Sequence, residues 1–352
     1  MFGMGMLAGL TASRWSPAAT PEVWQQDLSS PLGQLRVPQP LALTGRPQLS
    51  PLPPADEVWE CQVVVLGGSL GGVAAAAHAM KAGAQTCLIE VSPWLGGQIS
   101  SQGVSALDES LQMRRQGTLS QSWMGFRSLI KQQTADLPDW SPGPKARRVE
   151  EINRCWVGTL CFPPRAGARA SEVLLEQAAA AAPDSRWATM TAFKGAEFDS
   201  SGRHITAVYG VRRVPRDPNY VPKGRLSAEL AQWYSWSPTA DYDRVPIKLQ
   251  PPPGGKMQVI DATDTGEFIG WARVPYRVGS EAKATMGEPN GADFDNPECT
   301  QAFTYPFSLA IHNDNGDSLA VLKRLQPTYA IHEHNSVFDL EGFPFFGGKS
   351  VF

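Results

Sequence analysis

One segment, residues 61–98, constrains the fold of this 352-residue chain more than any other. A short β-branched run, 62–66, predicts a strand buried on both faces, since it lacks alternating polar residues. Glycines follow at once, and a run of small residues, 74–80, then predicts a helix. Residues 86–89 predict a second buried strand, which Glu90 closes. This order indicates half of a dinucleotide-binding unit built on a parallel sheet.

The glycines after the first strand predict where a pyrophosphate would lie. Gly67 would make the tight turn out of the strand, and Gly72 would let the helix pack closely on the sheet. Ser69 takes the middle position of the G-x-G-x-x-G pattern, so the match is incomplete. Its hydroxyl could donate to a phosphate oxygen, and Gly68 could carry part of the close approach. Together with Gly71, these residues form the predicted cofactor-binding turn.

Glu90 is the predicted ribose-binding residue. It lies 18 residues after Gly72, close to the roughly 20 expected for a carboxylate that accepts hydrogen bonds from an adenosine ribose. Two other interpretations stay open. Glycines can occur at the turn of any buried strand-turn-helix unit without a nucleotide, and an acid at a strand end is often only solvated.

A second glycine loop, WLGGQ at 94–98, follows Glu90 directly. Gly96 and Gly97 would let the chain run along a flat ring, and Gln98 offers it a donor and an acceptor. With the serine-rich stretch 100–109, this loop resembles bacterial FAD-dependent oxidoreductases of the glutathione-reductase type. Two further segments carry the resemblance, CWVGTLCFPPR at 155–165 and VIDATDTG at 259–266.

The resemblance implies an α/β fold, with a Rossmann-like FAD-binding domain and an inserted mixed α+β region on the substrate side. It implies FAD as the cofactor, with the isoalloxazine near Gly97 and Gln98. Asp264 and Gly266 would face the cofactor where the chain re-enters the FAD domain, although a capped helix entry explains the same residues. No residue identifies itself as a catalytic acid or base, so Gln98 and Arg165 are only candidates for ring or substrate contacts.

The expected parts of the chain follow from these segments. They are a proline-rich extension (1–58), an FAD-binding half (59–113), an inserted region (114–255), a return to the FAD domain (256–280) and an incomplete C-terminal region (281–352). The inserted region should hold helices at 122–134 and 171–182, the second capped by Ser171, and a hairpin over 186–213. The aromatic and proline-rich connector 214–255 would be a lid over the flavin, an interface or a surface insertion.

Charge and cysteine usage narrow the function class. A net charge of −3 and a pI near 6.0 give no field that would attract nucleic acid or an anionic membrane. Cys61 and Cys87 are expected to act as small apolar core residues. Cys155 and Cys161 could form a redox pair beside a flavin, but two unpaired thiols are expected. The odd number of cysteines gives little support for disulfides.

The two ends of the chain carry weaker signals. The apolar stretch 1–12 is too short to span a bilayer and lacks a basic flank. It could be the remnant of a signal or anchor that starts upstream, which is weak evidence for export, while a cytoplasmic location stays slightly favoured. Gly316-Asp317 is the one candidate for a closing segment of the FAD site, and a C-terminally truncated family member is expected. His332 and His334 lack a third ligand, so no metal site is predicted.

The leading hypothesis is an FAD-dependent oxidoreductase that passes hydride or electrons between the flavin and an unknown small-molecule substrate. A truncated, non-catalytic remnant of such a flavoprotein is the first alternative, because Ser69 weakens the glycine pattern. An NAD(P)-dependent dehydrogenase is the second, and the 94–98 loop argues against it. The oligomeric state stays open.

Overall fold

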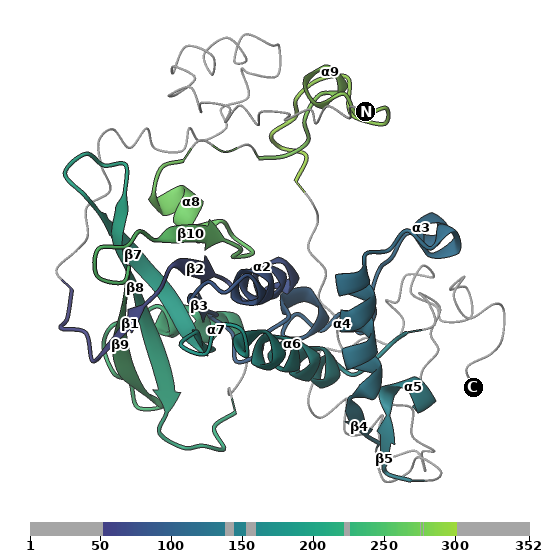
Figure 1. Ribbon diagram of the computed structural model, residues 1–352, viewed down its shortest axis with the longest axis horizontal. Coiled ribbons are helices and arrows are strands. Elements are labelled where there is room, and N and C mark those ends of the chain that lie inside the picture. The colour runs from purple at the N-terminus through teal and green to yellow at the C-terminus, as the bar shows by residue number, and fades with distance from the viewer. Residues whose placement is uncertain are drawn as a thin grey trace, which may run out of the picture. The chain divides into compact units, whose positions relative to one another are not determined.

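The structure, a computed structural model (Figure 1), describes residues 52–137, 144–152, 160–221, 226–274, 276 and 278–300. These residues fall into two compact units, 52–272 and 273–300. Several sequence predictions lie outside the described residues: the extension up to residue 51, segment 153–159 with Cys155, Gly316-Asp317, and the histidines 332 and 334.

Four parallel strands form the first sheet. In spatial order they are β10 (Gln258–Asp261), β2 (Val63–Leu66), β3 (Thr86–Ile89) and β6 (Arg186–Ala188). Val63 pairs with Thr86 on one side and with Gln258 on the other. The parallel sheet predicted from the glycine segment is therefore confirmed, and the segment that re-enters it pairs directly with the strand that leads into the glycine turn.

Helix α2 (Leu70–Lys81) connects β2 to β3 and covers one face of this sheet together with α6 (Pro164–Ala179). Val65 and Leu88 point from the sheet toward these helices, whose contact surface includes the alanines 76, 77 and 178. Small side chains let helix and sheet backbones approach closely. Gly83 follows α2 with a φ of +84°, as a glycine that ends a helix should.

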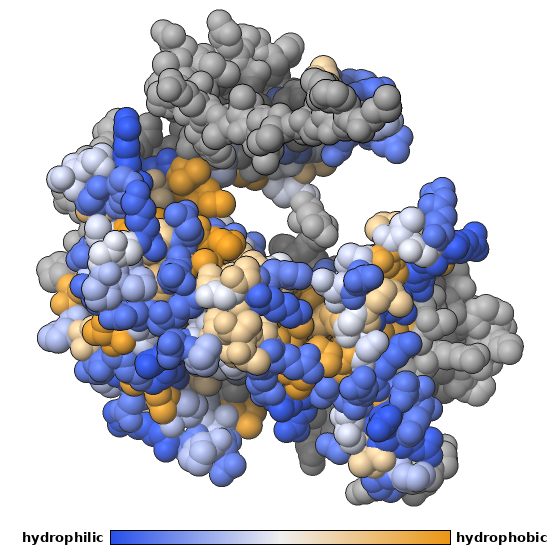
Figure 2. All heavy atoms as spheres, viewed as in Figure 1, coloured by the Kyte–Doolittle hydropathy of each residue, from blue (hydrophilic) through white to orange (hydrophobic). Residues whose placement is uncertain are grey.

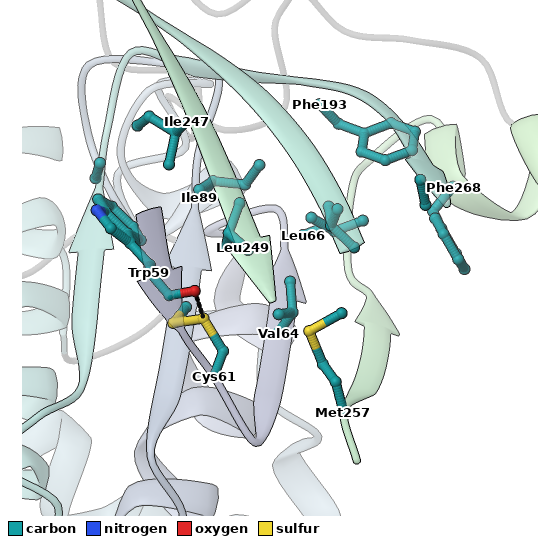
Figure 3. Close-up of a cluster of buried hydrophobic side chains, with 14 residues drawn as sticks. Trp59, Cys61, Val64, Leu66, Ile89, Phe193, Ile247, Leu249, Met257 and Phe268 are labelled. Atoms are coloured by element: carbon teal, nitrogen blue, oxygen red, sulfur yellow. Dashed lines mark hydrogen bonds between the residues drawn. A yellow bond between two sulfur atoms is a disulfide. The ribbon is translucent and has the colours of Figure 1, made fainter. Parts of the chain in front are cut away.

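A second, mixed sheet lies over the opposite face. Its order is β1 (Glu57–Glu60), β9 (Tyr242–Gln250), β8 (Ile205–Pro215) and β7 (Thr191–Phe198), and only the β1–β9 pair is parallel. Apolar side chains from both sheets fill the space between them (Figure 3). The core includes Trp59, Val64, Leu66, Ile89, Phe193, Val208, Ile247 and Leu249. The two sheets therefore share one core.

A smaller region packs beside the start of α6. It contains η1 (Gly97–Ile99), α3 (Leu111–Gln116), α4 (Gln121–Gln132), the hairpin β4 (Thr134–Asp136) and β5 (Ala146–Arg148), and α5 (Val149–Ile152). Hydrophobic residues gather where α4 meets α6, whereas hydrophilic residues predominate over β7 to β9 (Figure 2). Ile99, Phe126, Ile130 and Phe162 share one buried cluster here, which anchors η1.

Ser171 does not cap a helix, contrary to the sequence prediction. Helix α6 begins at Pro164, seven residues earlier, and the hydroxyl of Ser171 donates to the carbonyl oxygen of Gly167 within it. Proline is well suited to the first turn of a helix because its missing N–H has no acceptor there.

The hairpin prediction is confirmed from Thr191 onward, but residues 186–188 form β6 of the parallel sheet.

The connector 214–255 contains a helix and a strand that the sequence did not predict. These are α7 (Leu226–Trp233) and the nine-residue β9, whose alternation of buried and more exposed side chains is interrupted at Pro246. Pro246 concealed this strand in the sequence, since proline cannot donate to a ladder. In the structure, Pro246 pairs with Val211, and pairing of β9 with β1 begins one residue later at Ile247.

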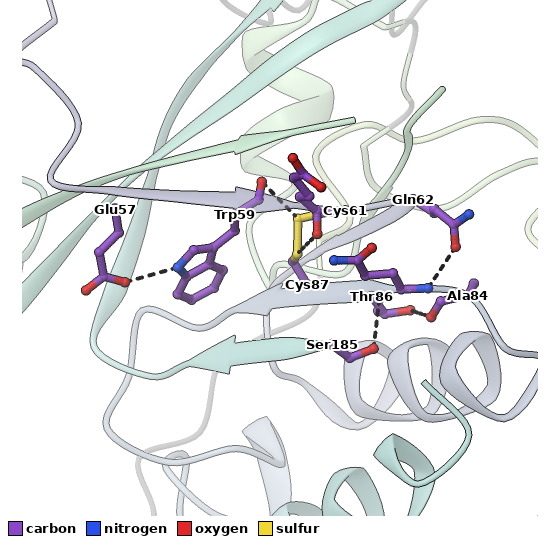
Figure 4. Close-up of a disulfide and its surroundings, with 10 residues drawn as sticks. Glu57, Trp59, Cys61, Gln62, Ala84, Thr86, Cys87 and Ser185 are labelled. Carbon is purple, nitrogen blue, oxygen red and sulfur yellow. Dashed lines mark hydrogen bonds between the residues drawn. A yellow bond between two sulfur atoms is a disulfide. The ribbon is translucent and has the colours of Figure 1, made fainter. Parts of the chain in front are cut away.

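Cys61 and Cys87 form a disulfide (Figure 4), so the prediction of reduced apolar cysteines is wrong. Cys61 lies between β1 and β2, Cys87 lies in β3, and both are fully buried. The pairing depends on β2 lying beside β3, which brings the residue before β2 close to Cys87, and spacing alone does not reveal this. Cys161 is disulfide-bonded as well, against the expectation of a free thiol, and Cys299 is free and exposed.

The last elements belong to different units. Helix α8 (Glu267–Trp271) follows β10 in the first unit, where Phe268 and Trp271 pack edge-on against Phe193. In the second unit, a bridge between Ser280 and Asn296 and the short α9 (Lys283–Met286) form a compact turn structure. Across the described residues, no helix has the length and apolarity that crossing a membrane requires.

Candidate cofactor-binding site

Three loops that are distant in sequence meet at the start of α2. They are the turn Gly67–Ser69, the loop around Gly96-Gly97, and residues 262–264 after β10. The amide of Gly96 donates to the carbonyl oxygen of Gly68 at 2.7 Å. The hydroxyl of Ser69 donates to the carbonyl oxygen of Ala262 at 2.8 Å. All three glycine-bearing segments singled out in the sequence therefore form one site.

Close backbone packing explains why glycines occupy the first turn. Gly67 has a φ of +94°, and a Cβ placed on it would lie 2.4 Å from the carbonyl oxygen of Ala262. A Cβ on Gly72 would lie only 1.9 Å from the carbonyl oxygen of Gly67. Neither contact is sterically allowed. The turn therefore requires glycine at 67 because of the backbone of residues 262–263, which follow β10, and not only because a ligand would approach it.

Ser69 caps α2. Its side-chain oxygen accepts a hydrogen bond from the amide of Gly72 at 3.2 Å, and its hydroxyl proton is directed at Ala262. The hydroxyl is therefore already used within the protein, unlike the phosphate donor that we considered from the sequence. Gly97 packs against Ser69, since a Cβ on Gly97 would lie 3.0 Å from the Ser69 Cα. A serine at this position links the three loops.

Glu90 lies beside the turn and is only 8% exposed. Its Oε2 accepts the amide of Gly68 at 2.5 Å, and its Oε1 accepts the amide of Ser92 at 2.7 Å. Burial raises the pKa of Glu90, and the nearby Asp264 raises it further, while the two amide hydrogen bonds act in the opposite direction. A carboxylate can accept about four hydrogen bonds, so each oxygen retains capacity for a ligand hydroxyl.

Asp264 is joined to the site by a residue that the sequence did not single out. The side-chain amide of Gln102 donates to Asp264 Oδ2 at 2.7 Å. Burial raises the pKa of Asp264, and this hydrogen bond lowers it. Gly266 precedes α8 with a φ of +64° and has no neighbour within 4 Å of its Cβ position.

The capped helix entry considered for residues 261–266 is present. Asp261 Oδ2 accepts the amide of Ile269 at 2.9 Å, and Thr263 Oγ1 accepts the amide of Glu267 at 2.8 Å. Asp261 Oδ1 also accepts the amide of Thr263. Asp261 and Thr263 therefore shape this turn, whereas Asp264 accepts its hydrogen bond from Gln102.

The open part of the site is the first turn of α2. Gly71 is exposed, and its amide has no acceptor within the part of the chain that the structure describes. The first amides of a helix lack intrahelical acceptors and carry the positive end of its dipole. An anionic group can therefore be bound here by the backbone, whereas Gly67, Gly68 and Gly72 are buried.

Gln98 and Arg165, the two candidates for ring or substrate contacts, are both exposed. Their segments are in contact, because a Cβ on Gly167 of α6 would lie 2.4 Å from the carbonyl oxygen of Ile99. No hydrogen bond or ion pair joins the two side chains among the described residues. Within these residues there is also no group of three His, Cys, Asp or Glu side chains that could hold a metal ion.

Comparison with known families agrees with this geometry. Residues 62–213 match the family described as FAD dependent oxidoreductase. The match begins at the strand before the glycine turn and ends in β8, so it includes the turn, Glu90 and the Gly96-Gly97 loop. FAD is the cofactor of this family, and the resemblance first seen in these motifs is confirmed. A search of curated proteins gives no match.

Several solved structures share limited similarity with the chain. A geranylgeranyl bacteriochlorophyll reductase-like protein from Thermoplasma acidophilum is 17% identical, with a TM-score of 0.30 over 61% of this chain. L-proline dehydrogenase from P. horikoshii is 12% identical, with a TM-score of 0.34 over 64% of this chain. The chain spans 42% of the first of these proteins and 59% of the second.

The segment that matches the FAD dependent oxidoreductase family has features that fit FAD. The exposed start of α2 suits a pyrophosphate, and Glu90 suits a ribose that donates two hydroxyl groups. Gly97 packs against Ser69. Because Gly97 has no side chain, it does not cover the first turn of α2. The residues present are therefore compatible with FAD.

Proposed function

We propose that this protein is an FAD-dependent oxidoreductase that acts on a small-molecule substrate. The observation that carries the proposal is the meeting of three loops at the exposed start of α2, with Glu90 buried beside them. The family of residues 62–213 supports it independently. When bound, FAD would supply the hydride or electron transfer itself.

The chain's own residues would bind and orient the cofactor. The backbone from Gly67 to Gly72 would hold the pyrophosphate, with the amide of Gly71 as an available donor, and Glu90 would accept the ribose hydroxyls. Gly96, Gly97 and Gln98 would run beside the flavin ring. Asp264 and Gly266 would approach from the returning strand, and Arg165 would attract an anionic substrate group.

The test is whether the purified protein binds FAD, measured by the absorption of oxidised flavin. We expect a yellow protein, or a colourless one that becomes yellow when FAD is added. Gly72→Val should lower FAD content about tenfold or more, because its Cβ would overlap the Gly67 carbonyl oxygen. A tenfold loss corresponds to roughly 1.4 kcal/mol of binding free energy.

Gly125→Ala is the matched control, because Gly125 is exposed on α4 with no neighbour within 4 Å of its Cβ position. It should retain wild-type FAD content. A folded wild-type protein that takes up no FAD would contradict the proposal. It would favour a non-catalytic remnant instead, which is the second candidate because the Gly68 amide and the Ser69 hydroxyl both have protein partners already.

A further inference from the structure

Arg213, near the end of β8, is a buried cation whose position the cofactor motifs do not explain. It is 2% exposed, and within the described residues no carboxylate lies at salt-bridge distance from it. Burial lowers its pKa to about 10, so it stays charged at neutral pH. A buried charge is costly unless hydrogen bonds and nearby groups compensate it. Tyr242 and Glu229 favour the charged form of Arg213, and its hydrogen bonds show what the side chain holds in place.

The guanidinium of Arg213 reaches the loop that follows β3. Its Nη1 donates to the carbonyl oxygen of Val91 at 2.7 Å, and Val91 is the residue next to Glu90. The other side of the guanidinium lies on the ring of Trp233, 3.9 Å from its centroid. Trp233 lies at the end of α7, so the segment 214–255 packs against the side chain of Arg213.

The backbone of Arg213 holds the same loop. Its amide donates to the carbonyl oxygen of Met190 at 2.9 Å, and the amide of Met190 donates to the carbonyl oxygen of Ser92 at 2.9 Å. The amide of Ser92 in turn donates to Glu90 Oε1. Side chain and main chain of one residue therefore fix both ends of the turn that aims the Glu90 carboxylate.

We propose that Arg213 is a positioning residue that holds Glu90 in the orientation needed to bind the adenosine ribose of FAD. The inference rests on the proposed function. Arg213 acts through the Val91 carbonyl and the turn geometry, because it forms no direct hydrogen bond with the Glu90 carboxylate. Its effect on FAD affinity should therefore require Glu90.

A double-mutant cycle tests this requirement, with FAD affinity measured by quenching of flavin fluorescence. Arg213→Met should weaken FAD binding about tenfold in the wild-type background and by less than about twofold in a Glu90→Gln background. Arg213→Lys keeps the charge and should show the same dependence on Glu90 with a smaller loss. It serves as the second variant if Arg213→Met does not fold.

Arg244→Met is the matched control. Arg244 is also buried, lies 5.4 Å from the Tyr242 ring, and donates to the carbonyl oxygens of Ser235 and Gln232, away from the Glu90 turn. It should leave FAD affinity within about twofold of wild type. Equal losses from the Arg213 variant in both backgrounds would show a general structural role and overturn the inference. A wild-type protein that binds no FAD would instead overturn the proposed function itself.

Discussion

Glu90 makes the stability of the FAD-free protein depend on pH. Burial disfavours its charged form, so its pKa in the folded protein lies above the ordinary value of 4.5. The folded state then keeps a proton that the unfolded state has lost. Between pH 4.5 and the raised pKa, the free energy of unfolding should fall as pH rises, with no further change from this group above that pKa.

Urea denaturation of wild type and Glu90→Gln, from about pH 4 to about pH 8, measures this effect. The amide side chain of the variant does not titrate, so the stability of wild type minus that of the variant should decrease across the window and then become constant. A difference that increases with pH would mean that the amide hydrogen bonds of Gly68 and Ser92 outweigh burial.

Single residues were predictable where their reason is local. Gly67 and Glu90 were found from the sequence because a tight turn and an acid at the next strand end recur at fixed spacing. Gln102 and Arg213 were missed because their partners, Asp264 and Val91, lie 162 and 122 positions away. Ser69 combines the two cases: its hydrogen bond with Gly72 is local, whereas its bond to Ala262 joins residues far apart in the sequence.

Helix α6 fixes the second glycine loop through one close contact. A Cβ on Gly167 would lie 2.4 Å from the carbonyl oxygen of Ile99 in η1. Gly167→Ala should therefore lower the free energy of unfolding by about 1–3 kcal/mol, although alanine favours helix by about 1 kcal/mol. Urea denaturation would measure this loss.

Gly125→Ala again provides the comparison, because it makes the same change on an open helix face. It should raise the free energy of unfolding by about 0.5–1 kcal/mol. If both variants gained stability, α6 and η1 would not be in close contact.

Whole elements were predicted well where periodicity was uninterrupted and poorly where it was not. The predicted strand over residues 86–89 matches β3 residue by residue. Pro246 broke the alternation of β9, and Ser171 imitated a cap inside α6. Proline and serine are both typical of the ends of strands and helices. Here Pro246 lies inside a strand because pairing with β1 starts only at Ile247, and Ser171 lies inside a helix because its hydroxyl bonds to Gly167.

The Cys61–Cys87 disulfide ties the link between β1 and β2 to β3, within the core that the two sheets share. It closes a loop of 26 residues, for which loop-closure entropy gives about 3.5 kcal/mol of stabilisation. A double variant, Cys61→Ala with Cys87→Ala, should lose stability of this order in thermal or urea unfolding. The same variant with and without reductant controls for the second disulfide, at Cys161.

Both cysteines are fully buried, so alkylation after mild reductant should leave them unlabelled until the protein unfolds. Rapid labelling in the folded protein would contradict the buried pairing.

For the whole molecule, the sequence predicted the parallel sheet but not the second sheet. The reason is that β1 and β9 pair across 190 positions, Glu57 with Ile247.

The bond between Ser69 and Ala262 also sets an order of events during synthesis. The two residues are 193 positions apart, and a ribosome that adds about 5–20 residues per second needs roughly 10–40 s to make that stretch. Throughout that interval the glycine turn exists without the strand that packs on it. The nascent chain must keep the apolar β2 and β3 segments from aggregating before the site can close.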